Sequence, residues 1–429
     1  MDTPQDTPGA LSTQKALALP LGDVLPGVRK AGALSPKRPA VETAGLADVF
    51  PYYAGFSFEW ARHHLAQHET ELVSGATVLD PWNGSGTTTL AAQSLGLDAI
   101  GLDLNPVANV VAKLRAQDYT QAEEVKRPHS GTEVCVDDDP LTAWLAESTI
   151  RRVRQWCKVG EDSRGSTRDL LTVALFRAIR EVTKKFEGSN PTWVKRAKDA
   201  ADTVLVANEE LDVIIERHVR FVSSRVGTQP FSKRAHIMTA DSRKMPIASG
   251  AVDIVVTSPP YLTRIDYAVA YSRELALLGV NISSDRSLRA GLMGTTLIRR
   301  QAEAPVAVGK VGSALLSLIQ KHDSKASSGY YLKQAQQYLT DLSSGLDEIT
   351  RVCRSSATMH LVVQDSFYKD VHVPLAGICI DEATMRGWVL KNEPERFPVR
   401  RTLTSLNKFA QTYKKGDVAE SVLTFYRGK

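Results

Sequence analysis

A short motif after a hydrophobic strand carries the residues best suited to chemistry. Residues 252–257 are apolar on both faces of a predicted strand, as in the centre of a parallel sheet, and Ser258 follows directly. Pro259 and Pro260 then prevent both further strand pairing and a helical turn. A Ser258 oxygen and the Pro259 carbonyl group could accept the two N–H donors of an exocyclic amine, while Tyr261 could stack on the ring. The motif therefore indicates a site for a planar ring that bears an amine, although a strand that ends in a rigid proline turn would have the same sequence.

A glycine-rich turn lies far upstream of this motif. A predicted strand at 77–80 is followed by Gly84 and Gly86, and a predicted helix begins at Thr87 or Thr88. The two glycines would let backbone N–H groups approach a ligand closely, and the first turn of the helix offers unpaired donors at its positive end. The turn is therefore suited to a ligand that carries a carboxylate.

A second short strand is predicted at 99–103 and ends in an acid. Asp103, at the end of a strand beside the glycine-rich turn, is placed to accept hydrogen bonds from ribose hydroxyls. A dinucleotide-binding unit would share this spacing of strand, turn, helix and strand. The two segments together predict a ligand with a ribose.

The fuller sequence strings are more specific. Asp-Pro-x-x-Gly-x-Gly-Thr at 80–87 and Gly-x-Asp-x-Asn-Pro at 101–106 resemble the S-adenosylmethionine-binding motifs of amino-group DNA methyltransferases. Ser-Pro-Pro-Tyr at 258–261 resembles the catalytic motif of those members that make N4-methylcytosine. Trp82 stands where that family usually has Phe, which preserves an aromatic wall. The resemblance spans roughly residues 50–105 and 236–426.

The resemblance implies a role for each matching residue. The catalytic motif would consist of Ser258, Pro259, Pro260 and Tyr261. The residues of the two upstream strings that would bind the cofactor are Asp80, Pro81, Trp82, Gly84, Gly86, Thr87, Thr88, Asp103, Leu104 and Asn105.

Three further segments match the family in the expected order. Asp241, just past a strand that begins at residue 237, would accept a hydrogen bond from the adenine amine of the cofactor, with Ser242 beside it. In an aromatic segment before the glycine-rich turn, Tyr53 and Phe56 would close over the methionine end of the cofactor. A late strand, turn and helix at 359–388 would complete the domain.

We therefore expect an α/β fold, a doubly wound and mostly parallel sheet of the class I, Rossmann-like methyltransferase type. About 150 residues separate the cofactor motifs from the Ser-Pro-Pro-Tyr strand, more than a compact series of strands and helices needs, so a helical insertion is predicted between them. The predicted regions are a flexible N-terminal arm at 1–45, the cofactor-binding half at 46–125, a basic helical insertion at 126–235 as candidate DNA-recognition region, the catalytic strand region at 236–279, a second candidate recognition segment at 280–345, and the C-terminal part of the methyltransferase domain at 346–429.

Positive charge is concentrated in the predicted insertion. From Arg151 to Arg234 there are 18 lysines and arginines against 11 aspartates and glutamates, so this segment carries +7 whereas the whole chain carries +5. Arg151, Arg152, Lys195 and Arg196 could contact DNA phosphates, and such contacts give affinity without sequence choice. An ordinary solvated helix face would carry the same charges.

The second candidate recognition segment follows the catalytic strand. It contains Arg299 and Arg300, a polar stretch at 321–329 that could become ordered on DNA, and a predicted helix at 330–349. The polar stretch could equally be a loop without a role. Arg264, just after the catalytic motif, could help hold a flipped base or its phosphate.

Composition agrees with an enzyme of the cell interior. At 429 residues, 43% hydrophobic and 24% charged, the chain can bury one large core and a smaller domain. The four cysteines form no C-x-x-C pair, so neither zinc nor a disulfide framework is predicted, and none follows a proline as in the nucleophile of cytosine C5 methylation. The first 45 residues read as a flexible arm, not as a signal peptide or membrane span. We expect no metal, no membrane contact and a cytoplasmic, nucleoid-associated protein.

The predicted reaction moves a methyl group from S-adenosylmethionine to the N4 amine of cytosine at specific sites in double-stranded DNA. The base must be flipped out of the duplex, because its amine is unreachable inside it. A restriction nuclease would be a fitting partner. Adenine N6 methylation uses the same geometry, and Ser in place of Asp at position 258 favours cytosine. An RNA amino-methyltransferase or a catalytically silent DNA-binding subunit could also carry these motifs.

Overall fold

The computed structural model describes residues 34–38, 45–53, 55–67, 75–116, 124–188, 190, 193–226, 233–262, 265–300, 307–399 and 418–428. At their centre is an eight-stranded sheet in the order β3-β2-β1-β4-β5-β10-β8, with β9 also paired to β10. Its strands are β1 (Thr77–Asp80), β2 (Asp98–Asp103), β3 (Ala235–Thr239), β4 (Val252–Thr257), β5 (Cys353–Gln364), β8 (Trp388–Leu390), β9 (Glu395–Pro398) and β10 (Ala419–Arg427). The short strands β6 (Ser366–Tyr368) and β7 (Val371–Val373) form a separate hairpin.

The first five strands of the sheet run parallel, and β10 is antiparallel to β5, β8 and β9. The strand order reverses at β1, which lies between β2 and β4. Ligands of open α/β sheets bind at the carboxyl ends of the strands beside such a reversal. The expected doubly wound, mostly parallel sheet is confirmed.

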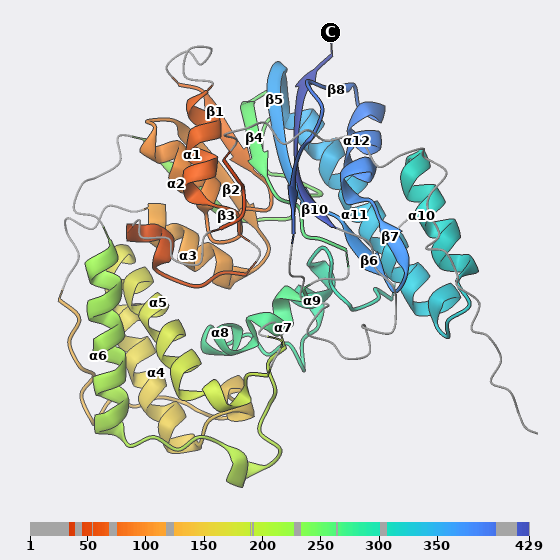
Figure 1. Cartoon of the computed structure of the whole chain (residues 1–429). Coiled ribbons are helices and arrows are strands. Elements are labelled where there is room, and N and C mark those ends of the chain that lie inside the picture. The colour runs from red at the N-terminus through yellow and green to blue at the C-terminus, as the bar shows by residue number, and fades with distance from the viewer. Residues whose placement is uncertain are drawn as a thin grey trace, which may run out of the picture.

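Helices cover both faces of the sheet (Figure 1). The helices on the first face are α1 (Phe58–Ala66) and α2 (Thr87–Ser94), with α3 (Pro106–Ala116) beside α2. The helices on the second face are α10 (Lys310–Lys321), α11 (Leu332–Val352) and α12 (Leu375–Met385). Because successive side chains of a strand point to opposite faces, Val78 of β1 packs in the first layer and Leu79 in the second.

Three long helices lie between α3 and β3 in the chain. They are α4 (Glu147–Asp162), α5 (Gly165–Val182) and α6 (Asn208–Arg225), accompanied by the short 3-10 helices η2 (Pro140–Ala143), η3 (Lys184–Phe186) and η4 (Ala200–Asp202). Ile150, Val153 and Trp156 recur at helical spacing on α4 and are fully buried. They share a core with α3 and with two short helices after the catalytic motif, α7 (Tyr267–Ala270) and α8 (Ser272–Leu277). The inserted helices therefore pack against the elements that flank the catalytic motif.

Much of the segment at 280–345, the second candidate recognition segment, packs against the sheet. Its helices α10 and α11 bury Leu315, Leu339 and Leu342 in the core of the sheet's second face. The helix α9 (Ser287–Gly291) and the π-helix η5 (Ser327–Tyr331) are short elements in the same segment. Much of the segment is thus part of the methyltransferase core.

The structure describes only a small part of the predicted N-terminal arm. Of the predicted arm at 1–45, only residues 34–38 and residue 45, which begins the 3-10 helix η1 (Gly45–Asp48), are described, and the rest lies outside the described residues. No helix within the described ranges is long and apolar enough to span a membrane.

Candidate active site

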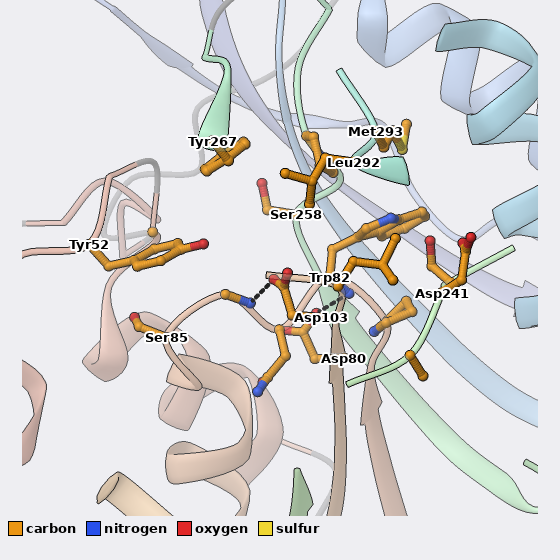
Figure 2. A pocket seen from close by; sticks show the side chains of 18 of the residues that line it. Tyr52, Asp80, Trp82, Ser85, Asp103, Asp241, Ser258, Tyr267, Leu292 and Met293 are labelled. Carbon is orange, nitrogen blue, oxygen red and sulfur yellow. Dashed lines mark hydrogen bonds between the residues drawn. The ribbon is translucent and has the colours of Figure 1, made fainter. Parts of the chain in front are cut away.

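A pocket lies at the carboxyl ends of β1, β2, β3 and β4, where the loops that follow these strands meet. The predicted residues that line it are Tyr53, Phe56, Asp80, Pro81, Trp82, Gly84, Thr87, Asp103, Leu104, Asp241, Ser242, Ser258 and Pro260. Figure 2 shows that Tyr52 and Ser85 lie at one end, that Asp103 lies near the middle, and that Trp82 and Asp241 lie toward the other end. Cofactor motifs and the catalytic motif, far apart in the sequence, therefore face one pocket.

The two glycines of the turn after β1 have different tasks. Gly84 (φ 50°) lines the pocket, and a Cβ atom there would lie 3.0 Å from the Tyr52 ring. Gly86 (φ 84°) is not among the lining residues, and a Cβ atom there would lie 2.9 Å from Cβ of Ala112 on α3. Both backbones adopt the left-handed conformation that favours glycine. Gly84 thus permits the close approach of the turn to the Tyr52 ring, whereas Gly86 permits the close packing of α2 on α3.

Asp103 at the end of β2 faces the pocket and holds the glycine turn. Its carboxylate accepts hydrogen bonds from the backbone N–H of Gly84 (3.0 Å) and from that of Asn105 (2.8 Å). Burial raises the pKa of Asp103 to about 6, and these two hydrogen bonds only partly offset the effect of burial. Asn105 itself caps α3 by accepting from the N–H of Val107 (3.1 Å) and does not line the pocket.

Asp80 at the end of β1 is almost completely buried and fixes the strand ends beneath the pocket. Its carboxylate accepts hydrogen bonds from Thr88 of α2 (2.8 Å), Thr257 of β4 (2.5 Å) and the backbone N–H of Trp82 (3.1 Å). Burial raises its pKa to about 6 against the effect of these bonds. Thr88, predicted to bind the cofactor, is fully buried and acts here as a tie between α2, β1 and β4.

The far end of the pocket combines an aromatic wall with an ion pair. Asp241 accepts three hydrogen bonds from the Arg243 side chain and one from its backbone N–H, at 2.7 to 3.1 Å. Burial would raise the pKa of Asp241, but the bonds from Arg243 outweigh burial and hold the pKa below its usual range. Asp241 therefore keeps its negative charge. Beside it, Trp82 fits against α11 because residue 345 is glycine; a Cβ atom there would lie 2.8 Å from the indole ring.

The catalytic motif contributes Ser258 and Pro260 to the pocket. The Ser258 hydroxyl donates to the Tyr261 hydroxyl (3.2 Å), so its lone pairs are available to accept from a ligand. The Pro260 carbonyl accepts from the Tyr338 hydroxyl of α11 (2.8 Å), which fixes the proline turn. Pro259 is buried, and neither Pro259 nor Tyr261 is among the lining residues.

Several lining residues were missed by sequence reasoning. They are Tyr52, Gly55, Asn83, Ser85, Ala240, Arg243, Gly291, Leu292 and Met293. Tyr52 stacks on Tyr271 (ring centroids 4.7 Å apart, interplanar angle 10°) and lies 6.2 Å from the Tyr267 ring. Its neighbour Tyr53 was a sequence candidate, so the aromatic segment was the available signal. The position of Leu292 and Met293 carries no such signal, since it depends on long-range contacts.

The predicted DNA-contact residues fall into two groups. Lys195, Arg196 and Arg300 are exposed, and Arg151 is exposed beside Glu147 (2.8 Å). Arg152 and Arg299 instead make paired bonds to carboxylates. The two partners are Asp212, at 2.7 and 2.8 Å from Arg152, and Asp341, at 2.6 and 2.7 Å from Arg299. We therefore remove Arg152 and Arg299 from the DNA-contact residues, because their guanidinium groups serve internal ion pairs. Arg264 lies outside the described residues.

No cluster of three or more metal-ligating side chains occurs among the residues that the structure describes. The four cysteines, Cys135, Cys157, Cys353 and Cys379, are unpaired thiols.

Known proteins match this chain in sequence. A DNA methylase family model, for N6 and N4 methyltransferases, matches residues 34–113. The Type II methyltransferase M.BsoBI of Geobacillus stearothermophilus is 23% identical over 385 residues, which cover 76% of this chain and 75% of that protein. The Type II methyltransferase M.AvaI of Nostoc sp. is 22% identical over 286 residues, which cover 59% of this chain and 58% of that protein.

Solved structures match over most of the chain with low identity. A SAM-dependent methyltransferase from Methanosarcina mazei aligns with 84% of this chain and 95% of its own (8% identity, TM-score 0.30). A geranyl diphosphate methyltransferase in complex with sinefungin aligns with 85% of this chain and 76% of its own (7% identity, TM-score 0.31).

The sheet order and the pocket define a class I methyltransferase, whose cofactor is S-adenosylmethionine. The family model over residues 34–113 and the Type II relatives support an amino-group DNA methyltransferase, and the family model covers N6 and N4 enzymes alike.

Proposed function

We propose that this protein transfers a methyl group to the N4 amine of a flipped cytosine in double-stranded DNA. The observation that carries the proposal is the position of Ser258, which directly follows β4 and lines the same pocket as Asp103 and Asp241. A hydroxyl at this position can accept from one N–H of a base amine while it donates to Tyr261. Serine, rather than the aspartate of adenine-modifying members, favours cytosine as the base.

The pocket offers acceptor groups that suit S-adenosylmethionine. Gly84 leaves the space that a side chain would fill, and Asp103 offers a carboxylate to ribose hydroxyls. Asp241 stays ionised and offers an acceptor to the adenine amine, beside the Trp82 wall. When bound, the cofactor supplies an electrophilic methyl group on a sulfonium centre.

The chain's own contribution to the reaction is positioning. Ser258 would hold the amine so that its lone pair leaves conjugation with the ring and faces the pocket, and Tyr267 and Pro260 would bound the space for the base. Such alignment of two reactants supplies a large part of a rate enhancement without a covalent intermediate. Solvent can take the departing proton.

We propose that residues 193–196, which we call the tip of the insertion, contact DNA phosphates. Lys195 and Arg196 are exposed there, next to Trp193, whose residue surface is 57% exposed. The tip is anchored to α8, which follows the catalytic motif in the chain, because Glu187 pairs with Val194 by a β-bridge and binds Arg273 of α8 (2.8 Å). Since the relatives are Type II methyltransferases, we also propose that a restriction nuclease accompanies this enzyme.

Nucleoside analysis tests the proposed product. Plasmid DNA from cells that express the chain should yield N4-methylcytosine by mass spectrometry. DNA from cells that express Asp103→Ala, which removes the ribose acceptor, should contain little or none. N6-methyladenine in its place would overturn the base assignment, and a methylated amine found only in RNA would overturn DNA as the substrate.

A further inference from the structure

We propose that residues 287–300 form a strap that closes the adenine end of the cofactor pocket, and that Asp341 of α11 is the positioning residue that holds this strap in place. The inference deepens the proposed site. It rests on the binding of S-adenosylmethionine in this pocket and is independent of which base is methylated.

The strap reaches the pocket through its middle. Gly291, Leu292 and Met293 line the cavity, and Figure 2 shows Leu292 beside Ser258 and Met293 above Trp82, both across the pocket from Asp80 and Asp103. Leu292 belongs to the core of the inserted helices, whereas Met293 belongs to the core of α10 and α11. The strap therefore spans the junction between the two parts that border the pocket.

Two arginines bond to the backbone of the strap, Arg243 from outside it and Arg299 from within it. Arg243 donates from Nη2 to the carbonyl of Gly291 (3.1 Å), and Arg299 donates from Nε to the carbonyl of Ala290 (2.8 Å). These carbonyl groups directly precede Leu292. The direction in which Leu292 and Met293 enter the pocket thus depends on where the two guanidinium groups lie.

Asp341 places both guanidinium groups. Its side chain is completely buried, and its Oδ1 accepts from Nη1 of Arg243 (2.6 Å) and from Nη1 of Arg299 (2.7 Å). Its Oδ2 accepts from Nη2 of Arg299 (2.6 Å). One carboxylate therefore orients both cations that grip the strap, and these charge-assisted bonds are stronger than neutral ones.

The same network of charged side chains includes Asp241, the proposed acceptor for the adenine amine. Asp241, Arg243, Asp341 and Arg299 alternate in sign, so the row is neutral as a whole. Loss of the Asp341 charge would shift this row toward positive charge and would remove one of the carboxylates that bind Arg243, so that Arg243 would be drawn more strongly to Asp241. The carboxylate that we propose for the adenine amine would be drawn into that pair. Asp341 thereby influences the cofactor without touching the pocket.

Further bonds fix the strap on both sides. Gln337 of α11 accepts from the N–H of Arg299 (2.9 Å) and donates to the carbonyl of Leu297 (3.1 Å). Buried Asp266, near the catalytic motif, accepts from Arg289 (2.9 Å) and from the Thr296 hydroxyl (2.9 Å). The strap is consequently a fixed part of the pocket wall.

Calorimetric titration with S-adenosylmethionine and with adenosine tests the role of Asp341. Asp341→Asn should weaken the binding of both ligands about tenfold or more, because the adenine end of the pocket loses its cover and Asp241 shifts. In steady state, KM for S-adenosylmethionine should rise by a similar factor, while kcat at saturating cofactor and KM for DNA stay within about twofold. Asp347→Asn is the matched control, since Asp347 lies on the same helix and binds Arg386 (2.8 Å).

Arg299→Gln provides a second variant in case Asp341→Asn does not fold. It removes the grip on Ala290 and leaves the Asp241 to Arg243 contact in place, so it should weaken adenosine in the same direction. Unchanged cofactor affinity in both folded variants, or an equal loss in Asp347→Asn, would overturn the strap. Because binding is read without methyl transfer, a wild type that binds the cofactor but makes no N4-methylcytosine would overturn the proposed base and not the strap.

Discussion

Three carboxylates at the ends of neighbouring strands have different states of charge because their surroundings differ. Asp80 and Asp103 are desolvated and have a pKa of about 6, whereas Asp241 is held below its usual pKa by Arg243 against the effect of burial. The sequence predicts all three as acids that follow strands. It does not predict Arg243 as the partner that keeps Asp241 ionised, since the geometry of that pair depends on Asp341, 98 residues further along the chain.

The raised pKa of Asp103 makes cofactor binding depend on pH. The carboxylate is present above a pH of about 6 and is lost as the pH falls through that value, so its ability to accept from ribose hydroxyls is lost as well. Calorimetry between about pH 5 and pH 8 brackets a pKa of about 6. We therefore expect it to show that the affinity for S-adenosylmethionine falls at the acid end of this range.

Asp103→Asn separates this effect from the titration of Asp80. The variant should bind the cofactor more weakly at pH 8, by about tenfold, and with little change toward pH 5. If the same acid loss of affinity persists in Asp103→Asn, Asp80 is the group responsible and our assignment of Asp103 to the ribose is wrong.

At the scale of elements, the sequence predicts the strands that carry the site. β1, β2, β3 and β4 are found where strand patterns followed by polar residues indicate them, because buried parallel strands have a strong local signal. The role of the segment at 280–345 is not predictable in this way. Its helical periodicity fits a core helix and a recognition helix equally well, and only the tertiary packing shows that one face of α11 lies in the core.

The inserted helices carry a prediction about DNA affinity. Lys195→Glu combined with Arg196→Glu should weaken binding to all DNA sequences and reduce the slope of log K against log salt by about 2, since two exposed cations at the tip no longer meet phosphates. Filter binding at several salt concentrations measures both quantities.

Arg62→Glu with Lys113→Glu is the matched control for this charge reversal. These exposed cations lie on α1 and α3, away from the insertion tip, and the control should retain the wild-type slope. Equal slopes for wild type and the tip variant would show that the tip is a solvated structural face.

At the scale of the whole molecule, the site exists because the strand order brings distant segments to one edge. The loops after β1, β2, β3 and β4 meet although Asp80 and Ser258 are 178 residues apart in the chain. A family resemblance predicts this meeting, whereas the strap depends on tertiary contacts with no local signature. The sequence therefore predicts the floor of the pocket and the catalytic motif beside it, whereas the strap that covers the pocket is seen only in the structure.

Single-turnover methyl transfer by Ser258→Ala tests most directly whether the catalytic motif and the cofactor pocket form one active site. The change removes the proposed acceptor of the amine and leaves the proline turn, which Tyr338 fixes, in place. We predict that labelled methyl transfer to DNA falls about 100-fold or more, while the calorimetric affinity for S-adenosylmethionine stays within about twofold of wild type. Transfer at the wild-type rate by a folded Ser258→Ala protein would contradict the account.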